Sequence, residues 1–271
     1  MREARPDKEA TLKQAGGVAW LEAPLGRARA VFSTRVGGES PAPREGLNLA
    51  LHTESDPAIA IRNRLAFCDA VGAILDDLVL CRQVHGTDLL TVRPADAGAG
   101  GRSQDDRLGR ADGLVRPGPE PPLVIQVADC APVVIADPET GGGAVVHAGW
   151  RGAAGGIIGK AVEAVADMSE RGRSGLRAAI GPCVRSPEYE VGEEVYEAFG
   201  HWGAEREKVF QRSGQTLSLS LGRAVEIALL SAGIPQQAII DTAACTMSRQ
   251  DLFFSYRRDG VDSGRLWGML I

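Results

Sequence analysis

Three side chains that can bind a soft metal ion stand at the ends of apolar, strand-like segments. They are His85 in RQVHGTD, Cys130 in VADCAP and His147 in VVHAGW. Strand ends that lead into loops are places where a rigid scaffold presents functional groups. Two imidazoles and one thiolate match a zinc site with three protein ligands and an open fourth position, the arrangement of catalytic zinc. Such an ion could polarise a substrate oxygen or lower the pKa of a bound water to about 7.

The same residues also allow a plainer interpretation. A single histidine at a strand end is more often a hydrogen-bonded core residue, and a single cysteine is more often a small buried hydrophobe. The spacing of the three residues along the chain is not a zinc signature by itself. The residues alone therefore leave a metal site and ordinary packing open.

A glycine-rich junction follows the third of these residues, in the segment HAGWRGAAGG. Glycines between a strand and a helix leave backbone N–H groups free to face an anion, and the helix dipole favours negative charge there. Arg151 could add a forked, permanently charged donor to phosphate or carboxylate. The alternative is a packing turn in which Arg151 forms an ion pair at the surface.

Further polar residues near the expected element ends are candidates for substrate binding. They could bind sugar hydroxyls or phosphate, or they could decorate a loop: Ser33, Arg35, Asn48 and Arg64. Asp129, beside Cys130, could orient a ligand, act as a base or close a turn. Cys183 and Tyr189 are expected to have structural roles.

Apolar runs bounded by Pro, Asp and Gly predict the strands that must position these side chains. The expected strand segments are 28–35, 78–86, 88–92, 123–130, 131–138, 144–149, 176–184, 237–245, 253–260 and 265–271. Helices are expected from Trp150 onward and around 191–200 and 220–233. Mixed strands and helices without an internal repeat predict an α/β fold built on large sheets.

One helix has clear boundary signals. Asp56 suits the N-cap, Pro57 suits the first helical position, and Gly72 is a plausible stop. Residues at helical spacing predict its buried face: Ala58, Ile61, Leu65 and Cys68. No segment looks like a domain boundary, so we expect a polar, disordered N-terminal tail over residues 1–17 and one catalytic domain over residues 18–271.

Composition excludes several classes of protein. The formal net charge of −5 gives no basic face for nucleic acid. The charged N-terminus lacks the apolar core of a signal peptide, and no apolar run approaches the ~20 residues that span a bilayer. Five widely spaced cysteines without a C-x-x-C motif are a poor disulfide framework, so reduced thiols are expected. We therefore expect a cytoplasmic protein without a membrane partner, as a monomer or weak dimer.

Taken together, the motifs resemble the YfiH-like family, whose members are variously called laccase-like polyphenol oxidase, peptidoglycan editing factor and purine nucleoside phosphorylase. The resemblance runs from about Val31 to the end of the chain, and its motifs occur in the family's order. The combination of QVHG, ADC-P and HAGWRG is the specific part of it. The other matching segments are FSTRVGG, GLNLALH, RNRL, ADGLV, IGPCV, YEVGEEV, AACTM, FFSYRRDG and GRLWGMLI.

The resemblance implies a single-domain α/β/β/α sandwich with mixed sheets and a metal pocket on one side. It also implies that His85, Cys130 and His147 are the metal ligands, with zinc as the expected cofactor and copper as the alternative. The sequence departs from the family pattern in three places: VADC stands for TADC, GLNL for SLNL, and HTESD for HVGD. The last two fall in the expected substrate region, and they put the substrate-binding assignments in doubt more than the metal ligands.

The function that the resemblance favours is a zinc-dependent purine nucleoside phosphorylase. It would cleave adenosine, inosine, guanosine or methylthioadenosine with phosphate, and it could also deaminate adenosine. Asp129 would then be a catalytic proton shuttle beside the three ligands, and Arg35, Arg64 and Arg151 would hold phosphate.

Three alternatives remain at this point. A hydrolase that edits peptidoglycan precursors would use Cys130 as nucleophile and His147 or His85 as base. A copper-dependent phenol oxidase would need more ligands than one triad, and the chain has only four histidines. A structural metal or a binding module would leave the open coordination position without a purpose.

Overall fold

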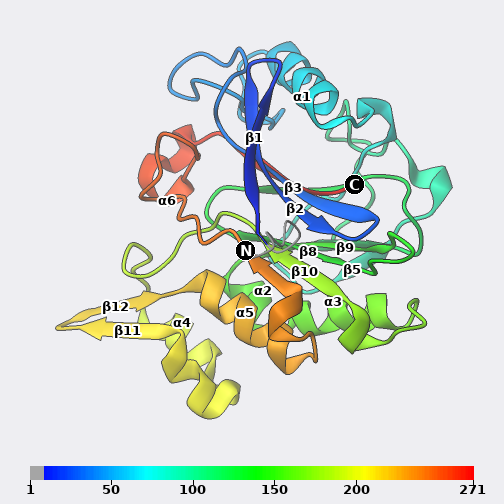
Figure 1. Cartoon of the computed structure of the whole chain (residues 1–271). Coiled ribbons are helices and arrows are strands. Elements are labelled where there is room, and N and C mark those ends of the chain that lie inside the picture. Colours follow the sequence, from blue (N-terminus) through cyan, green and yellow to red (C-terminus); the bar gives the residue numbers. More distant parts are fainter. Residues whose placement is uncertain (1–8) are drawn as a thin grey trace, which may run out of the picture.

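Two mixed six-stranded sheets lie face to face in the computed structural model, which describes residues 9–271 (Figure 1). The first sheet has the spatial order β1 (Thr11–Ala15), β2 (Val18–Leu25), β3 (Ala28–Ser33), β14 (Leu266–Leu270), β7 (Leu123–Val127) and β4 (Val79–Leu80). The second sheet has the order β13 (Ile239–Asp241), β10 (Arg177–Ile180), β8 (Ala131–Ala136), β9 (Gly143–Ala148), β6 (Gly113–Arg116) and β5 (Leu89–Thr91). A separate hairpin consists of β11 (Phe210–Ser213) and β12 (Thr216–Leu219).

Helices cover the outer faces of the two sheets (Figure 1). One helix, α1 (Pro57–Val71), lies over the first sheet. The second sheet is covered by α2 (Trp150–Ala154), α3 (Ile157–Ala166) and α5 (Leu221–Ser231). The remaining helices are α4 (Glu193–Ala198) and α6 (Tyr256–Asp259). This arrangement confirms the expected α/β/β/α sandwich with mixed sheets.

Three hydrophobic clusters hold these layers together. Between the sheets, Phe32 and Ile125 of the first sheet share a buried cluster with Val134 of the second. Phe67 of α1 and Trp267 of β14 belong to the cluster on the outer face of the first sheet, with their ring centroids 6.1 Å apart. The third cluster lies between the second sheet and its three helices. Burial on both faces explains why the central strands read as nearly continuous apolar runs.

Two connections carry the chain from the first sheet to the second. Residues 81–88 link β4 to β5, and residues 128–130 link β7 to β8. His85 lies in the first connection and Cys130 in the second. Both residues therefore stand at the edge where the two sheets meet, which puts side chains distant in sequence within reach of each other.

Helix α1 has the predicted boundaries but not the predicted buried face. Asp56 caps it by accepting a hydrogen bond from the N–H of Ala58 at 2.9 Å, and Gly72 ends it in a left-handed conformation. Ala58 and Leu65 are exposed, although the apolar spacing placed them in the core, whereas Cys68 is buried as predicted. The buried face instead carries two polar residues that bond inside the fold, together with small and apolar residues: Ala60, Asn63, Arg64, Phe67, Cys68 and Val71.

Two other predictions are corrected by the structure. The predicted tail, residues 1–17, is wrong for Thr11–Ala15, which form β1 and pair antiparallel with β2; residues 1–8 lie outside the described part of the chain. The segment 253–260, expected as a strand, contains the short helix α6, because the Ser255 side chain accepts the N–H of Arg258 and starts a turn.

All five cysteines are free thiols, as expected. Among residues 9–271 there is no helix with the length and apolar character required to cross a bilayer.

Candidate metal centre and active site

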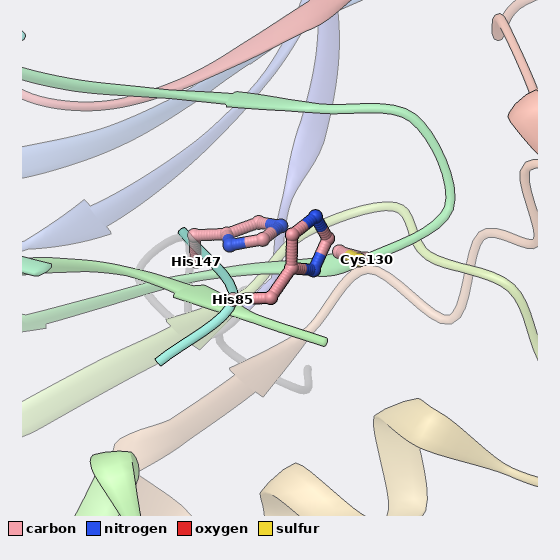
Figure 2. Close-up of side chains that lie close together, drawn as sticks. All are labelled: His85, Cys130 and His147. Carbon is pink, nitrogen blue, oxygen red and sulfur yellow. The ribbon is translucent and has the colours of Figure 1, made fainter. Parts of the chain in front are cut away.

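His85, Cys130 and His147 come together at the edge where the two sheets meet. One ligand atom from each lies within 4.8 Å of the others, and Figure 2 shows the three side chains gathered around one point. The two imidazole rings are nearly perpendicular, with their centroids 4.8 Å apart. His147 is buried, Cys130 is half-buried and His85 is exposed. The group is therefore anchored in the core on one side and open on the other.

The pairing of β8 with β9 places Cys130 beside His147. These strands are antiparallel, with Ala131 opposite Ala148 and Pro132 opposite His147. Cys130 directly precedes β8, so its thiol emerges at the same end of the strand pair as the His147 ring. The register of two fully buried strands thus fixes two of the three candidate ligands.

A buried carboxylate positions the third ligand. The backbone of His85 has φ = 59°, a left-handed conformation that costs a non-glycine residue roughly 1–2 kcal/mol. Asp112, fully buried before β6, accepts the N–H groups of Val84, His85 and Gly86 at 3.1, 2.9 and 2.6 Å. These hydrogen bonds stabilise the tight turn that presents the His85 ring.

Asp112 also orients His147. Its Oδ1 lies 2.7 Å from Nδ1 of His147. A carboxylate oxygen accepts, so Nδ1 carries the hydrogen and Nε2 is left free to bind a metal. Burial raises the pKa of Asp112, but the hydrogen bonds from His147 and from the N–H of Gly86 outweigh burial and hold the pKa below its ordinary value. Asp112 is thus an anion at neutral pH.

Charges within the group favour a thiolate. Burial raises the pKa of the Cys130 thiol, but the charge and hydrogen bond of His147, followed by those of His85, outweigh burial and lower it. Burial likewise lowers the pKa of His147, whereas Cys130 and Asp112 raise it above its ordinary value. A thiolate is the form of cysteine that binds a metal or acts as a nucleophile.

Gly149 leaves the space that the group needs. A Cβ atom at this position would lie 3.0 Å from Sγ of Cys130 and 3.3 Å from Nδ1 of His85. The first glycine of HAGWRG is thus required because any side chain would press on two of the three candidate ligands. Arg151, predicted to bind an anion in this segment, is exposed and stacks over the ring of Trp150.

The three side chains form part of the wall of a cavity of about 870 Å³. The cavity is rich in cationic and amide side chains, and its one acid is Asp129. The lining residues are His52, Gln83, His85, Gln104, Arg107, Gln126, Val127, Ala128, Asp129, Cys130, His147, Tyr189, Tyr256, Arg257 and Arg265. Within residues 9–271, Arg107, Arg257 and Arg265 have no ion-pair partner. The cavity is therefore suited to an anionic ligand.

Arg107 is held by a network of glutamine side chains. Its guanidinium donates to Oε1 of Gln126 at 2.8 Å. The Gln83 side chain in turn accepts the N–H of Gln126 and donates to its carbonyl, both at 2.7 Å. Burial lowers the pKa of Arg107, and Arg82 lowers it further, although the nearby Cys81 acts in the opposite direction. Arg107 is thus rigidly held without a neutralising carboxylate.

Asn48 acts behind the opposite wall of the cavity. Its Oδ1 accepts the backbone N–H of Arg265 at 2.8 Å, and its Nδ2 donates to Thr53 at 2.8 Å. These bonds fix Arg265 and the turn that carries His52. Partial burial, followed by the charges of Arg265 and Arg107, lowers the pKa of His52 to about 4. Asn48, predicted to contact substrate, is not on the cavity wall but positions two residues that are.

Asp129 has a left-handed backbone, with φ = 85°, and both of its carboxylate oxygens are engaged. Oδ1 accepts the hydroxyl of Thr246 at 2.6 Å, and Oδ2 accepts the N–H of Arg257 at 2.6 Å. Asp129 lines the cavity but is 7% exposed. These contacts favour a positioning role, in which Asp129 ties α6 to Cys130, over the predicted role of proton shuttle.

Two predicted substrate residues are buried structural residues. Ser33 accepts the N–H of Trp267 at 2.8 Å, which links β3 to β14. Arg64 is fully buried, donates to the carbonyls of Leu49 and Gly101 at 2.9 and 2.6 Å, and lies over the Trp267 ring. Neither residue lines the cavity.

Two further predicted substrate residues also lie outside the cavity, Arg35 half-buried and Arg151 exposed. Arg35 donates to the carbonyls of Glu45 at 2.9 Å and Gln250 at 3.4 Å. Arg151 is exposed and stacks over the Trp150 ring, 4.3 Å from its centroid. Arg35 thus stabilises neighbouring loops, and Arg151 packs on the first residue of α2. The arginines that line the cavity are others.

Asp112 and the three arginines of the cavity, Arg107, Arg257 and Arg265, are not among the residues predicted from the sequence. Asp112 stands in ADGLV, directly before a buried strand, and an acid in that position could have been identified as a candidate site residue. Arg107 lies in the polar segment 93–110, which looks like a plain surface loop. Arg257 and Arg265 lie near strand-like segments that gave no indication of which way their side chains point.

Comparisons with known proteins find relatives over most of the chain. The model of a family described as multi-copper polyphenol oxidoreductase laccase matches residues 29–271. A purine nucleoside phosphorylase of Deinococcus radiodurans is 34% identical over 256 residues, which are 94% of this chain and 94% of that protein. A protein named adenosine deaminase RL5, from an unknown prokaryotic organism, is 32% identical over 224 residues, covering 81% of this chain and 84% of that protein.

Solved structures share the fold. The crystal structure of YlmD from Geobacillus stearothermophilus superposes with a TM-score of 0.87 at 31% identity, covering 98% of each chain. At this identity and coverage the likeness extends over both sheets and the residues between them.

Proposed function

The chain belongs to the family described as multi-copper polyphenol oxidoreductase laccase, and from this premise we propose that it is a metal-dependent purine nucleoside phosphorylase. Its substrates would be adenosine, inosine, guanosine or methylthioadenosine, together with phosphate. Relatives of similar length bear the name purine nucleoside phosphorylase, which supports an enzyme acting on small molecules.

The donor set fits a single metal ion. Two imidazole nitrogens and one thiolate sulfur within 4.8 Å suit zinc, and they would also accept copper. When bound, the ion would supply Lewis-acid polarisation at the open side of the group. In the described part of the chain this is the one close group of three such donors, whereas multi-copper oxidation needs several. The donor count thus favours nucleoside chemistry over phenol oxidation.

One observation carries the choice of phosphate as co-substrate. Three arginines without ion-pair partners, Arg107, Arg257 and Arg265, line the same cavity as the three donors. Arginine binds phosphate through paired hydrogen bonds, and a site without nearby free acids strengthens that attraction. We assign the phosphate to the region around Arg107, next to His52.

In the reaction, a phosphate oxygen forms a bond to C1′ of the ribose, and the bond from C1′ to the base nitrogen breaks. The electron pair of that bond and one proton leave with the purine, and ribose 1-phosphate remains. The arginines would hold the phosphate against C1′, where positive charge develops in the transition state. Gln83 and Gln126 would keep Arg107 in place during this step.

Adenosine deamination is a second candidate, favoured by the relative named adenosine deaminase RL5. In that reaction water replaces the amino group at C6 of the purine, and ammonia is released. The open side of the same three donors would face C6. Because both oxygens of Asp129 accept hydrogen bonds, we do not assign the proton transfer to Asp129.

The test is phosphate-dependent release of hypoxanthine from inosine by the purified, zinc-loaded chain. We expect release with wild type and a loss of at least 100-fold with Cys130→Ser. Cys245→Ser changes a thiol of similar exposure outside the group of donors and should retain activity. If none of the four purine nucleosides releases its free base in the presence of phosphate, the proposal is refuted. The second candidate is tested by incubating the same protein with adenosine and measuring the ammonia released.

Alkylation of Cys130 shows whether this residue is a metal ligand or a thiol nucleophile. If Cys130 binds the ion, an alkylating reagent should modify it only after a chelator removes the metal. If Cys130 is alkylated equally fast in the zinc-loaded chain, the peptidoglycan-editing thiol hydrolase becomes the better account.

A further inference from the structure

We propose that the purine base stacks on the ring of Tyr256, so that this residue selects for the base; the inference rests on the proposed function of the cavity. Tyr256 lines the same cavity as the three donors and the arginines, yet its side chain is 49% exposed. It is the first residue of α6, far in sequence from His85 and Cys130. An aromatic ring left open on a cavity wall is a surface that a flat ligand can cover.

The backbone on both sides of Tyr256 is fixed. The Ser255 side chain accepts the N–H of Arg258 at 3.2 Å, and the N–H of Asp259 donates to the Ser255 carbonyl at 2.9 Å. On the other side, the N–H of Arg257 donates to Asp129 at 2.6 Å. Asp129 directly precedes Cys130, so the position of Tyr256 is tied to the candidate metal ligand. The backbone that carries Tyr256 therefore has a defined place, although the side chain itself is largely exposed.

The arginines beside the two tyrosine rings of the cavity also favour an aromatic ligand. The guanidinium carbon of Arg265 lies 5.5 Å from the centroid of the Tyr256 ring, and that of Arg257 lies 5.0 Å from the centroid of Tyr189. Tyr189 and Tyr256 are the two aromatic rings, other than histidines, among the cavity-lining residues. Each has an arginine close to its ring, and Tyr256, at 49% exposure, still has ring surface free to contact a ligand.

A purine base fits this wall better than a sugar or a phosphate does. Bases stack on aromatic side chains irrespective of their exact identity, because every base has a π-face. Phosphate would lie near Arg107, so the aromatic wall is left for the base of the nucleoside. The ribose and the glycosidic bond would then lie between Arg107 and Tyr256.

The experiment measures inosine binding to the zinc-loaded chain in the absence of phosphate, and then the KM for inosine and for phosphate in turnover. The variants are Tyr256→Ala, Tyr256→Phe and, as the matched control outside the cavity, Tyr196→Ala. Thermal unfolding of each variant checks that it is folded. We expect Tyr256→Ala to weaken inosine binding and raise its KM about 10- to 100-fold, with the KM for phosphate changed less than threefold. Tyr256→Phe keeps the ring and should bind within about threefold of wild type, as should Tyr196→Ala.

Two results overturn the inference in different ways. If wild type binds and cleaves inosine but Tyr256→Ala does so equally well, or if Tyr256→Phe loses as much as Tyr256→Ala, stacking on this ring is refuted while the proposed function stands. If wild type neither binds nor cleaves any purine nucleoside, the proposed function fails and the inference fails with it.

Discussion

Oδ1 of Asp112 accepts a hydrogen bond from Nδ1 of His147 at 2.7 Å, and the same carboxylate holds the backbone turn of His85. One buried acid thus positions two of the three candidate metal ligands, one in the connection from β4 to β5 and one in strand β9. The arrangement fixes the tautomer of His147 and compensates for the left-handed backbone of His85. We expect the metal affinity of the site to depend on Asp112 nearly as strongly as on the ligands themselves.

Replacing Asp112 by Asn should lower metal affinity about 10- to 100-fold, because the amide can no longer accept all of these hydrogen bonds and no longer carries charge. Metal content after competition with a chelator measures this. Asp137→Asn is the matched control, since Asp137 is 3% exposed and accepts hydrogen bonds from Glu139, Thr140 and Ser169 away from the site. Both variants should lose stability, but equal metal affinity in the two would contradict the role of Asp112.

Gly149→Ala should weaken metal binding and activity at least tenfold. The added methyl group would meet Sγ of Cys130 at 3.0 Å and must displace it. Gly159→Ala is the control, because Gly159 lies in the first turn of α3 and a Cβ atom there meets nothing within 4 Å. That substitution should stabilise the chain by about 0.5–1 kcal/mol without affecting metal content. The comparison is made by thermal unfolding and by metal analysis, and normal metal binding by Gly149→Ala would show that the gap is not needed.

Arg107→Ala should raise the KM for phosphate about 10- to 100-fold, the loss expected for a charge-assisted hydrogen bond. The KM for inosine should change much less, since we assign the base to the other end of the cavity. Arg151→Ala, at an exposed arginine that stacks on Trp150, should leave both constants unchanged. Steady-state kinetics with each substrate varied in turn gives the answer. A phosphate KM that responds to Arg151 and not to Arg107 would return the phosphate site to HAGWRG.

His52 should titrate well below an ordinary histidine. Partial burial and then the charges of Arg265 and Arg107 lower its pKa to about 4. Because the unfolded chain has the higher pKa, of about 6.5, it binds more protons between pH 4 and 6.5, and this histidine makes folding less favourable as pH falls through that window. Proton NMR, with His52→Asn to assign the signal, measures the midpoint. Added phosphate should raise it by compensating the arginines, whereas a midpoint near 6.5 that ignores phosphate would contradict the assigned phosphate site.

The parts of the fold with strong local signals could be predicted from the sequence. The Asp56–Pro57 start and Gly72 stop of α1 are encoded within a few residues, and the central strands are apolar on both faces. The buried face of α1 could not be predicted from apolar spacing, because Arg64 enters the core through hydrogen bonds to distant carbonyls such as that of Gly101. Long-range polar contacts of this kind leave no periodic pattern in the sequence.

The candidate site divides in the same way. His85, Cys130 and His147 stand out because each is a metal-binding type at a strand end, and the structure brings them together. The substrate-binding residues could not be predicted in this way, because an arginine can reach a cavity from any nearby loop. Arg35 and Arg151 turn outward to carbonyls and a tryptophan ring, whereas Arg107 is drawn inward by Gln126.

Anomalous X-ray scattering from crystals of the zinc-loaded chain, measured on both sides of the zinc absorption edge, shows whether His85, Cys130 and His147 bind one ion. We expect one strong anomalous peak within about 2.0–2.3 Å of a nitrogen of His85, a nitrogen of His147 and the sulfur of Cys130, with the fourth position facing the cavity. The absence of a peak there, or a peak closed off by a fourth protein side chain, would contradict this expectation.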